Sequence, residues 1–260
     1  MFSKLFSSRK PAAVPTASVP EGLRIYAIGD IHGRLDLLDE LLTAIAADDS
    51  ARAPAKTHII FLGDLIDRGP SSAQVVERLR QFDQQNPGTH FLLGNHEEVF
   101  LKALSGDRKA LSFFVRIGGR ETVLSYGVSE EAYLQSDFDE LFELLIAHVP
   151  PAHIAFLERF EDLITFGDYA FVHAGVRPGE PLANQRTSDL RWIRDEFLNH
   201  TGTLEKIVVH GHSIAADVEV APHRIGLDTG AFASGKLSAM AFEGDRRWIL
   251  QTNGMAVPDC

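Results

Sequence analysis

Hydrophobic and polar positions change their spacing several times along the chain, and these changes divide it into predicted strands and helices. Residues 24–28, 58–62 and 89–93 are short, mostly apolar runs rich in β-branched or aromatic side chains, which favours strands. Apolar positions spaced as on one helix face follow at 35–47 and 72–81, and a further helical stretch follows the third run. Three strand–helix units in succession predict a mostly parallel sheet with helices packed on its faces.

The middle of the chain breaks this alternation. Residues 103–165 mix helical and polar stretches and predict a largely helical insert. The insert could form a cap or a substrate-selecting wall, or it could serve only in packing. Strand patterns return at 169–172 and 206–209, and strand-like pieces follow from residue 224 onward.

The beginning of the chain has a different composition. Residues 7–22 carry Ser, Pro, Ala and Gly with almost no large apolar side chains, so residues 1–22 are predicted to be a flexible leader before a single domain over 23–255. Residues 1–6 could lie on a membrane surface, but one or two turns with two Phe bury little apolar area. A disordered leader is therefore the favoured interpretation.

Composition narrows the class of protein. A chain of 260 residues that is 45% hydrophobic is long enough for one large domain. The net charge of −11 argues against a nucleic-acid backbone as the main partner. The single cysteine, Cys260, allows no internal disulfide, and no run approaches the roughly 20 apolar residues of a membrane-spanning helix. These features predict a cytoplasmic protein without a membrane span.

The chemistry is concentrated where the predicted strands end. Five strands are each followed at once by a glycine-flanked Asp, Asn or His, and the residues are Asp30, Asp64, Asn95, His173 and His212. A single Gly-Asp of this kind is most often only a turn. Ligands of α/β proteins bind at the carboxyl ends of the strands, however, and five such ends predict one shared crevice.

These side chains are typical metal ligands. Asp30 and His32 point to the same side of an extended chain and can hold one ion together, while Asp64 can bridge to a neighbouring ion. A neutral amide oxygen and two imidazoles would complete the second ion's ligand set: Asn95, His173 and His212. Oxygen and nitrogen donors without thiolates suit manganese, iron or zinc.

Two ions about 3.5–4 Å apart can share a hydroxide and clamp phosphate oxygens during in-line attack. The guanidinium of Arg68 could take two phosphate oxygens in a fork. His96 could protonate the leaving oxygen, with Asp67 orienting it. Two roles stay open for His210: it could hydrogen-bond to a metal ligand, or it could itself bind the first ion.

Complete motifs carry a family resemblance. Gly-Asp-x-His-Gly stands at 29–33, Gly-Asp-x-x-Asp-Arg-Gly at 63–69 and Gly-Asn-His-Glu at 94–97. Later matches are His-Ala-Gly at 173–175, Gly-His-Ser at 211–213 and Leu-Asp-Thr-Gly at 227–230. The chain resembles the calcineurin-like metallophosphoesterase superfamily, and within it the phosphoprotein phosphatase group of serine/threonine phosphatases, most closely the bacterial and bacteriophage lambda type.

The resemblance implies a four-layer α/β/β/α sandwich with a helical insert and a dimetal site that often holds manganese. It assigns one ion to Asp30, His32 and Asp64, and the other to Asp64, Asn95, His173 and His212. It also implies a second phosphate-binding arginine, for which Arg194 is the best match and Arg191 the alternative. Either arginine could instead be a charge on a helix surface.

The main functional hypothesis is a metal-dependent phosphoesterase of the serine/threonine protein phosphatase type, in which a metal-bridging hydroxide attacks a phosphomonoester. Its alternative is a symmetrical dinucleoside polyphosphate hydrolase acting on diadenosine tetraphosphate, which shares the motifs and differs in the pocket walls. The expected partner is thus a phosphorylated protein or a small phosphoester. Other small phosphoesters and cyclic nucleotides stay open, and a binding module without activity is disfavoured because no predicted ligand is missing.

Overall fold

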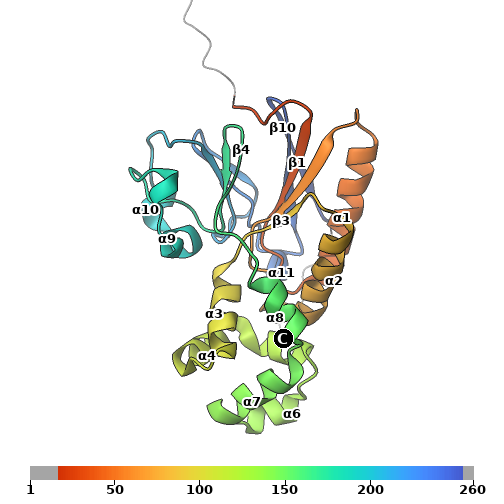
Figure 1. Cartoon of the computed structure of the whole chain (residues 1–260), viewed down its shortest axis with the longest axis vertical. Helices are drawn as coiled ribbons and strands as arrows, with labels where there is room; N and C mark the ends of the chain where they lie inside the picture. Colours follow the sequence, from red (N-terminus) through yellow and green to blue (C-terminus); the bar gives the residue numbers. More distant parts are fainter. Residues whose placement is uncertain (1–16, 254–260) are drawn as a thin grey trace, which may run out of the picture.

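A computed structural model describes residues 17–253 of the chain (Figure 1). The strands are β1 (Leu23–Ile28), β2 (Lys56–Phe61), β3 (Thr89–Phe91), β4 (Ile164–Phe166), β5 (Tyr169–Phe171), β6 (Ile207–His210), β7 (Glu219–Val220), β8 (Arg224–Gly226), β9 (Ser238–Glu243) and β10 (Arg246–Gln251). The predicted strand runs therefore recur, displaced by at most a few residues at either end.

Helices follow the first three strands and fill the middle of the chain. They are α1 (Leu35–Ser50), α2 (Ser72–Gln85), α3 (Asn95–Leu104), α4 (Arg108–Phe114), α5 (Arg120–Ser125), α6 (Glu130–Gln135), α7 (Phe138–His148), α8 (Pro151–Leu157), α9 (Thr187–Trp192), α10 (Asp195–Leu198) and α11 (Ala231–Ser234). A short segment kinked at Gly118, η1 (Val115–Gly119), joins α4 to α5, and a 3-10 turn, η2 (Leu182–Asn184), precedes α9.

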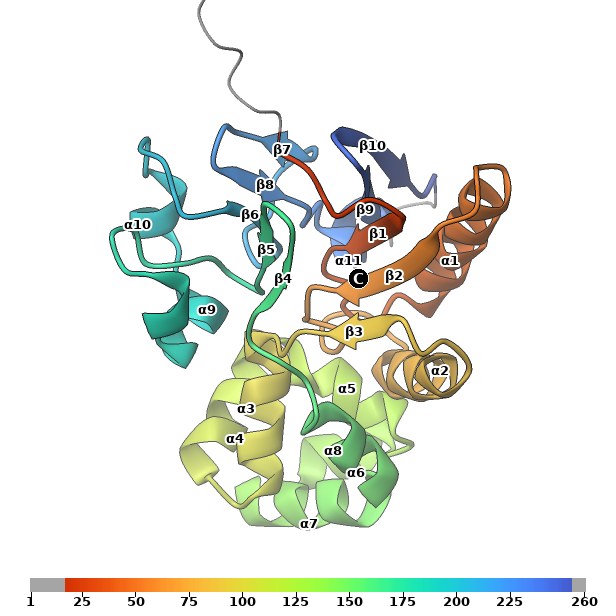
Figure 2. The ribbon, with the colours of Figure 1, turned by 45° about the horizontal axis from the view of Figure 1, so that its top comes forward.

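The strands form two mixed five-stranded sheets. The first has the order β10-β9-β1-β2-β3, in which β1, β2 and β3 are parallel and β9 and β10 are antiparallel. The second has the order β4-β5-β6-β8-β7, with antiparallel strands at both edges of a parallel centre (Figure 2). The three predicted strand–helix units form the parallel part of the first sheet, as expected, whereas the strands after the insert begin a second sheet and the last hairpin adds the antiparallel strand β9 beside β1.

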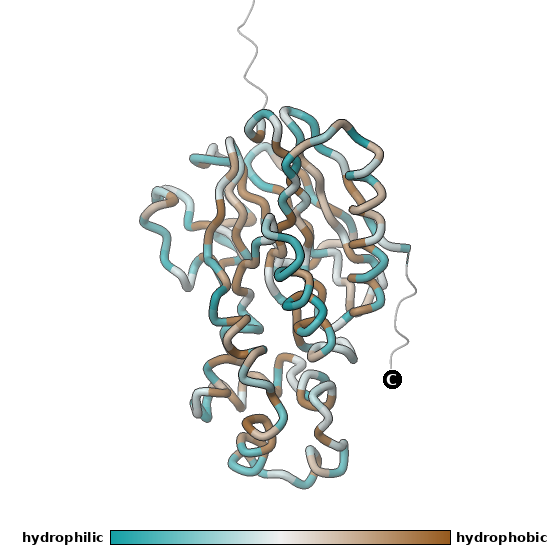
Figure 3. Tube along the Cα trace, turned by 45° about the vertical axis from the view of Figure 1, so that its right-hand side comes forward, coloured by the Kyte–Doolittle hydropathy of each residue, from teal (hydrophilic) through white to brown (hydrophobic). Residues whose placement is uncertain are grey.

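Alternating side chains create the layers. In β1, Ile25 and Ala27 join a cluster of apolar side chains that both sheets contribute, while Tyr26 and Ile28 face α1 and α2. In the second sheet, Ala170 and its neighbours pack outward against α9 and α10. Hydrophobic residues accordingly run along the strands at the centre of the molecule (Figure 3). This arrangement confirms the predicted four-layer α/β/β/α sandwich.

The insert forms a separate helical lobe beside the ends of the sheets (Figure 2). Helices run from α3 to the end of α8 at Leu157, so the prediction of a helical insert up to residue 165 is wrong at its end, where β4 pairs with β5 instead. No single helix in residues 17–253 is long and apolar enough to cross a membrane; α7 and α8 meet that length and composition only together, with a 93° bend between them.

Part of the predicted leader is packed on the domain. Val19 is buried, and its backbone N–H donates to the carbonyl of Gly244 at 3.0 Å. The N–H of Ser18 donates to a carboxylate oxygen of Asp168 at 2.8 Å. The expectation of flexibility is therefore wrong for these residues, since a small apolar side chain and two backbone donors suffice to fix the segment. Residues 1–16, and with them the membrane-surface hypothesis, lie outside the described residues.

Candidate functional site

The predicted ligands gather where parallel strands of both sheets end. Asp30 and His32 lie between β1 and α1, Asp64 lies between β2 and α2, and Asn95 begins α3 just after β3. His173 and His212 follow β5 and β6 of the facing sheet. All six side chains are buried, each with at most 5% of its surface exposed. The sandwich thus brings residues that are 182 positions apart into one polar cluster.

The backbone at this cluster is held in a conformation that most side chains avoid. Positive φ angles in non-glycine residues occur, within the described part of the chain, only at His32, Asp64, Asp67, Arg68 and His212, with values from 45° to 71°. All five are predicted site residues. Such left-handed conformations cost free energy and persist where the surrounding structure enforces them, which is common at functional sites.

Asp64 lies at the centre of two groups of potential ligand atoms. In one group it is joined by His32 and His96, and in the other by His173 and His212. Within each group, one ligand atom from every residue lies within 4.8 Å of the others. A carboxylate shared by two such groups has the position that the sequence predicted for a bridging ligand.

Two imidazoles are turned so that they can bind a cation. The Nδ1–H of His32 donates to the carbonyl of Ile66 at 2.8 Å, and that of His173 donates to the carbonyl of Leu62 at 2.7 Å. Their Nε2 atoms lie 3.7 and 3.4 Å from the Oδ2 atom of Asp64. A neutral imidazole bonded in this way presents a lone pair at Nε2, and a cation between that lone pair and the carboxylate oxygen would stabilise both. The donor set therefore fits divalent metal ions.

Asn95 links the two histidines of the second group. Its Oδ1 atom lies 2.9 Å from Nε2 of His173 and 2.7 Å from Nδ1 of His212. The Nε2 atom of His212 is buried and has no hydrogen-bond partner within the described residues. One amide oxygen and two imidazole nitrogens that converge in this way fit the ligand set of a metal ion.

A carboxylate that the sequence did not assign adds to the cluster. Asp228 is buried beside Asp30, and burial, followed by the charges of Asp228 and Asp64, raises the pKa of Asp30 well above its ordinary value. Burial also raises the pKa of Asp228. Buried carboxylates that repel one another fit a site for cations. In the sequence, only the Leu-Asp-Thr-Gly motif at 227–230 could have pointed to Asp228 as a site residue.

Glu97 holds the loop that carries Asp64. Its carboxylate accepts backbone N–H groups from Asp64 (2.9 Å), Leu65 (2.8 Å) and Ile66 (3.2 Å), together with that of Gly94 (3.1 Å). The side chain is fully buried, and burial together with the charge of Asp64 raises its pKa to about 7. The sequence placed Glu97 in a motif without a role, and the structure shows that it orders the loop after β2.

Gly94 stands where no larger residue would fit. A Cβ atom at this position would lie 2.3 Å from the backbone nitrogen of Asp64 and 2.5 Å from a carboxylate oxygen of Glu97. The loops after β2 and β3 therefore touch directly, which is why Asp64 and Asn95 can reach the same group of ligands.

The predicted acid, its partner and the phosphate-binding arginine form one chain of contacts. Asp67 accepts from the Nδ1–H of His96 at 2.6 Å, and Arg68 donates from Nη2 to the Nε2 atom of His96 at 3.1 Å. The guanidinium of Arg68 also lies over the ring of Phe232, 4.8 Å from its centre. Burial lowers the pKa of His96, but the charge of Asp64 and the hydrogen bond to Asp67 outweigh it and raise the value overall.

The two alternative arginines have different surroundings. Arg191 is paired with Asp162 at 2.6 Å and lies 3.6 Å from a carboxylate oxygen of Glu98. Arg194 is exposed, its side chain makes no hydrogen bond or ion pair within residues 17–253, and its charge adds to burial in lowering the pKa of His212. Only Arg194 has a guanidinium available to a ligand, which favours it over Arg191.

His210 is turned away from the cluster. Its ring packs against Phe197 of α10, with 5.1 Å between ring centres, and its Nδ1–H donates to the carbonyl of Gly211. It belongs to neither ligand group among the described residues. The hypothesis that His210 binds the first ion is therefore not supported by the geometry.

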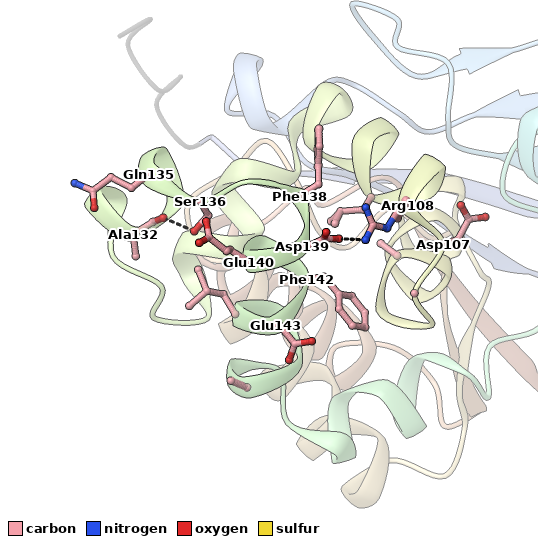
Figure 4. A pocket seen from close by; sticks show the side chains of 15 residues that line it. Asp107, Arg108, Ala132, Gln135, Ser136, Phe138, Asp139, Glu140, Phe142 and Glu143 are labelled. Atoms are coloured by element: carbon pink, nitrogen blue, oxygen red, sulfur yellow. Dashed lines mark hydrogen bonds and ion pairs between the residues drawn. The ribbon is translucent and has the colours of Figure 1, made fainter.

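A cavity lies away from the polar cluster, within the insert. A groove of about 1110 Å³ is lined by residues of α3, α4, α6 and α7, including Phe138 and Phe142 (Figure 4). Its charged lining residues include Arg108 and Asp139, which form an ion pair. None of the predicted site residues lines this groove. It therefore gives no support to the hypothesis that the insert forms a substrate wall at the polar cluster.

Known proteins are similar to this chain in sequence. The model of the calcineurin-like phosphoesterase family matches residues 23–255. A bis(5'-nucleosyl)-tetraphosphatase PrpE, asymmetrical, from Oceanobacillus iheyensis is 24% identical over 241 residues, which cover 85% of this chain and 89% of the relative. A symmetrical bis(5'-nucleosyl)-tetraphosphatase from Acidovorax ebreus is 30% identical over 187 residues, which cover 72% of this chain and 52% of the relative.

Solved structures share the fold. A crystal structure named as a candidate diadenosine tetraphosphatase superposes with a TM-score of 0.61 at 23% identity, covering 94% of this chain and 97% of the other. A cold-active protein-tyrosine phosphatase of a Shewanella species superposes with a TM-score of 0.54 at 18% identity, covering 92% and 83%. At these identities, the likeness extends to the arrangement of sheets and helices.

Proposed function

Because this chain belongs to the calcineurin-like phosphoesterase family, we propose that it is a metal-dependent hydrolase of dinucleoside tetraphosphates. The observation that carries the proposal is that relatives matched over most of this chain are named as tetraphosphatases, whether symmetrical or asymmetrical. These names favour the alternative of the sequence analysis over its main hypothesis, a serine/threonine protein phosphatase. Metallophosphoesterase chemistry is common to both.

In this proposal, Asp30, His32 and Asp64 hold one divalent ion, and Asp64 shares the second with the three remaining ligands, Asn95, His173 and His212. Bound there, the ions would activate water and neutralise charge on the phosphate oxygens. The positive φ angles, the orientation of the Nε2 lone pairs and the repulsion among buried carboxylates support this assignment. Manganese is the proposed metal on resemblance, and iron or zinc would suit the same donors.

Side chains around the ligands are proposed to bind the phosphate and to protonate the leaving group. Arg68 is proposed to bind phosphate oxygens, and its contact with Phe232 fixes the direction of its approach. His96 is proposed to give a proton to the leaving oxygen, with Asp67 holding its ring. Arg68 approaches Nε2 of His96 at 3.1 Å, so a phosphate group that draws Arg68 away would leave that nitrogen free to take up the proton that it then gives to the leaving oxygen.

Trp192 lies beside the second ligand group, and its indole ring is suited to stacking against the base of a nucleoside. The partly buried indole of Trp192 lies edge-on to His212, with 6.4 Å between ring centres, and its Nε1–H donates to Glu98 at 2.8 Å. Phe113 of the insert packs against Trp192 at 6.0 Å. Nucleobases stack on such faces, and Arg194 next to this wall could hold the distal phosphates.

A comparison of substrates tests the proposal. We expect protein reconstituted with manganese to cleave diadenosine tetraphosphate with a kcat/KM at least about tenfold above that for a phosphoserine peptide, a preference of about 1.4 kcal/mol in the transition state. Products separated by ion exchange show which bond breaks. Two molecules of ADP indicate symmetrical cleavage, and ATP with AMP indicate asymmetrical cleavage.

p-Nitrophenyl phosphate serves as the control substrate, because it reports the metal chemistry without either recognition element. Efficient cleavage of the peptide with poor cleavage of the dinucleotide would overturn the tetraphosphatase proposal and restore the protein phosphatase hypothesis. Failure on all three substrates would contradict phosphoesterase activity itself.

A further inference from the structure

We propose that Thr122, on helix α5 of the insert, is a positioning residue for the reaction, and that it acts by fixing the carboxylate of Asp67. The inference rests on the proposed phosphoesterase function and assigns the insert a part in it. Thr122 lies 55 residues from Asp67 along the chain and belongs to none of the metal-site motifs. Within residues 17–253 its hydroxyl makes no hydrogen bond to a predicted ligand, so its effect would pass through Asp67 and His96.

The contacts of Thr122 are all made in the interior. Its hydroxyl donates to Oδ1 of Asp67 at 2.6 Å and accepts the backbone N–H of Asp67 at 2.9 Å. Ser72, at the start of α2, lies 3.0 Å from the same hydroxyl and also accepts the N–H of Asp67. Thr122, Asp67 and Ser72 are each 0% exposed. Water therefore has no access to replace these bonds.

The two carboxylate oxygens of Asp67 have separate partners. Oδ1 accepts from Thr122, whereas Oδ2 accepts from the Nδ1–H of His96. A carboxylate held by only one oxygen can rotate about its terminal bond, and fixing the other oxygen removes this freedom. The Thr122 hydroxyl therefore sets the plane in which Asp67 meets the imidazole, and so the direction of its Nε2 atom.

The same part of the insert also holds Arg68. The backbone N–H of Arg68 donates to the carbonyl of Gly118 at 3.0 Å, and Gly118 lies at the kink of η1 between α4 and α5. Gly118 has φ 114°, and a Cβ atom there would lie 2.7 Å from Cγ of Arg68. The insert thus binds two consecutive residues with positive φ angles, Asp67 through Thr122 and Arg68 through Gly118. Both hydrogen bonds stabilise this strained stretch of backbone.

Thr122→Val tests the inference, because valine keeps the shape of the side chain and removes the hydroxyl. The variant is loaded with manganese, and its kcat and KM are measured on phenyl phosphate and on p-nitrophenyl phosphate. Phenol is a poor leaving group that needs the proton of His96, whereas p-nitrophenol leaves with little help. We expect kcat on phenyl phosphate to fall about tenfold more than on p-nitrophenyl phosphate, with KM little changed.

Thr122→Ser is the matched control, since it restores the hydroxyl and should recover most of the loss. Equal losses on both substrates, or no recovery with serine, would show a merely structural role and overturn the inference. If wild-type protein cleaves neither the aryl phosphates nor diadenosine tetraphosphate and the phosphoserine peptide, the proposed function fails first, and this result is distinct from an active wild type with an unchanged Thr122→Val variant.

Binding of inorganic phosphate tests the second contact of the insert, that of Gly118 with Arg68, by a readout that needs no turnover. Gly118→Ala should displace Arg68 and weaken phosphate binding, measured by calorimetry on the manganese-loaded protein, by about tenfold. Gly106→Ala, at a glycine with open space around its Cβ position, serves as the control for a positive φ glycine in the insert. Unchanged phosphate affinity in Gly118→Ala would contradict the contact between the insert and Arg68.

Discussion

Asp64→Asn is expected to lose both metal ions and to lower the hydrolysis of every phosphoester substrate by at least about 10³-fold, since metal ions contribute several kcal/mol to such reactions. Asparagine has nearly the shape of aspartate, but it lacks the negative charge that the two ligand groups share. The metal content of purified protein and kcat on p-nitrophenyl phosphate together check this expectation.

The stability of the variant separates loss of metal from loss of fold. In chelator, Asp64→Asn should melt somewhat below wild type but still unfold cooperatively, because His173, His96 and His32 outweigh burial and hold the pKa of Asp64 well below its ordinary value, so that its charge stabilises the folded state. Added manganese should raise the melting temperature of wild type and leave the variant unchanged. Asp245→Asn, in the exposed turn between β9 and β10, is the matched control. Full metal content and a normal rate in Asp64→Asn would contradict the bridging assignment.

The second large effect is expected for His96→Asn. General acid catalysis contributes about 10²–10⁴-fold, so kcat on phenyl phosphate should fall within this range while both ions stay bound. The reason is that both ring nitrogens of His96 are already engaged, by Asp67 and Arg68, which leaves neither free for a metal ion. Metal analysis and the loss on phenyl phosphate relative to p-nitrophenyl phosphate measure the two parts of the prediction.

His148→Asn, on the exposed end of α7, is the control for this substitution. A drop in metal content in His96→Asn would place the imidazole among the ligands of the first ion, where it lies within reach of His32 and Asp64. Unchanged turnover on phenyl phosphate would remove the proton-donor role.

The ligand cluster could be predicted from the sequence because its members share a local pattern. Each of Asp30, Asp64 and His173 follows an apolar strand directly, and the carboxyl ends of parallel strands must lie along one edge. The pattern did not reveal that two sheets contribute, because a strand's partner depends on pairing over long distances. The antiparallel return of β9 to β1 is such a pairing, with Ile28 opposite Ala239.

Residues that act through contacts distant in sequence were missed. Thr122 and Gly118 lie in the insert, whose helical pattern gives no sign that it reaches the loop after β2. The choice between Arg191 and Arg194 depends on Asp162, a residue about 30 positions away that pairs with Arg191. Glu97 was visible in its motif, but its task became clear only from the backbone N–H groups that converge on it. The roles of these residues depend on how helices, strands and loops pack together, and the spacing of apolar positions along the chain carries no information about that packing.

The most direct test of the central claim is a manganese titration of protein stripped with chelator, followed by calorimetry and by hydrolysis of p-nitrophenyl phosphate in the same samples. Two ions shared through Asp64 predict two equivalents bound per chain, with activity that is absent in the stripped protein and rises as the second equivalent binds. Full activity in the stripped protein, or saturation at a single equivalent with full activity, would contradict the two-metal assignment.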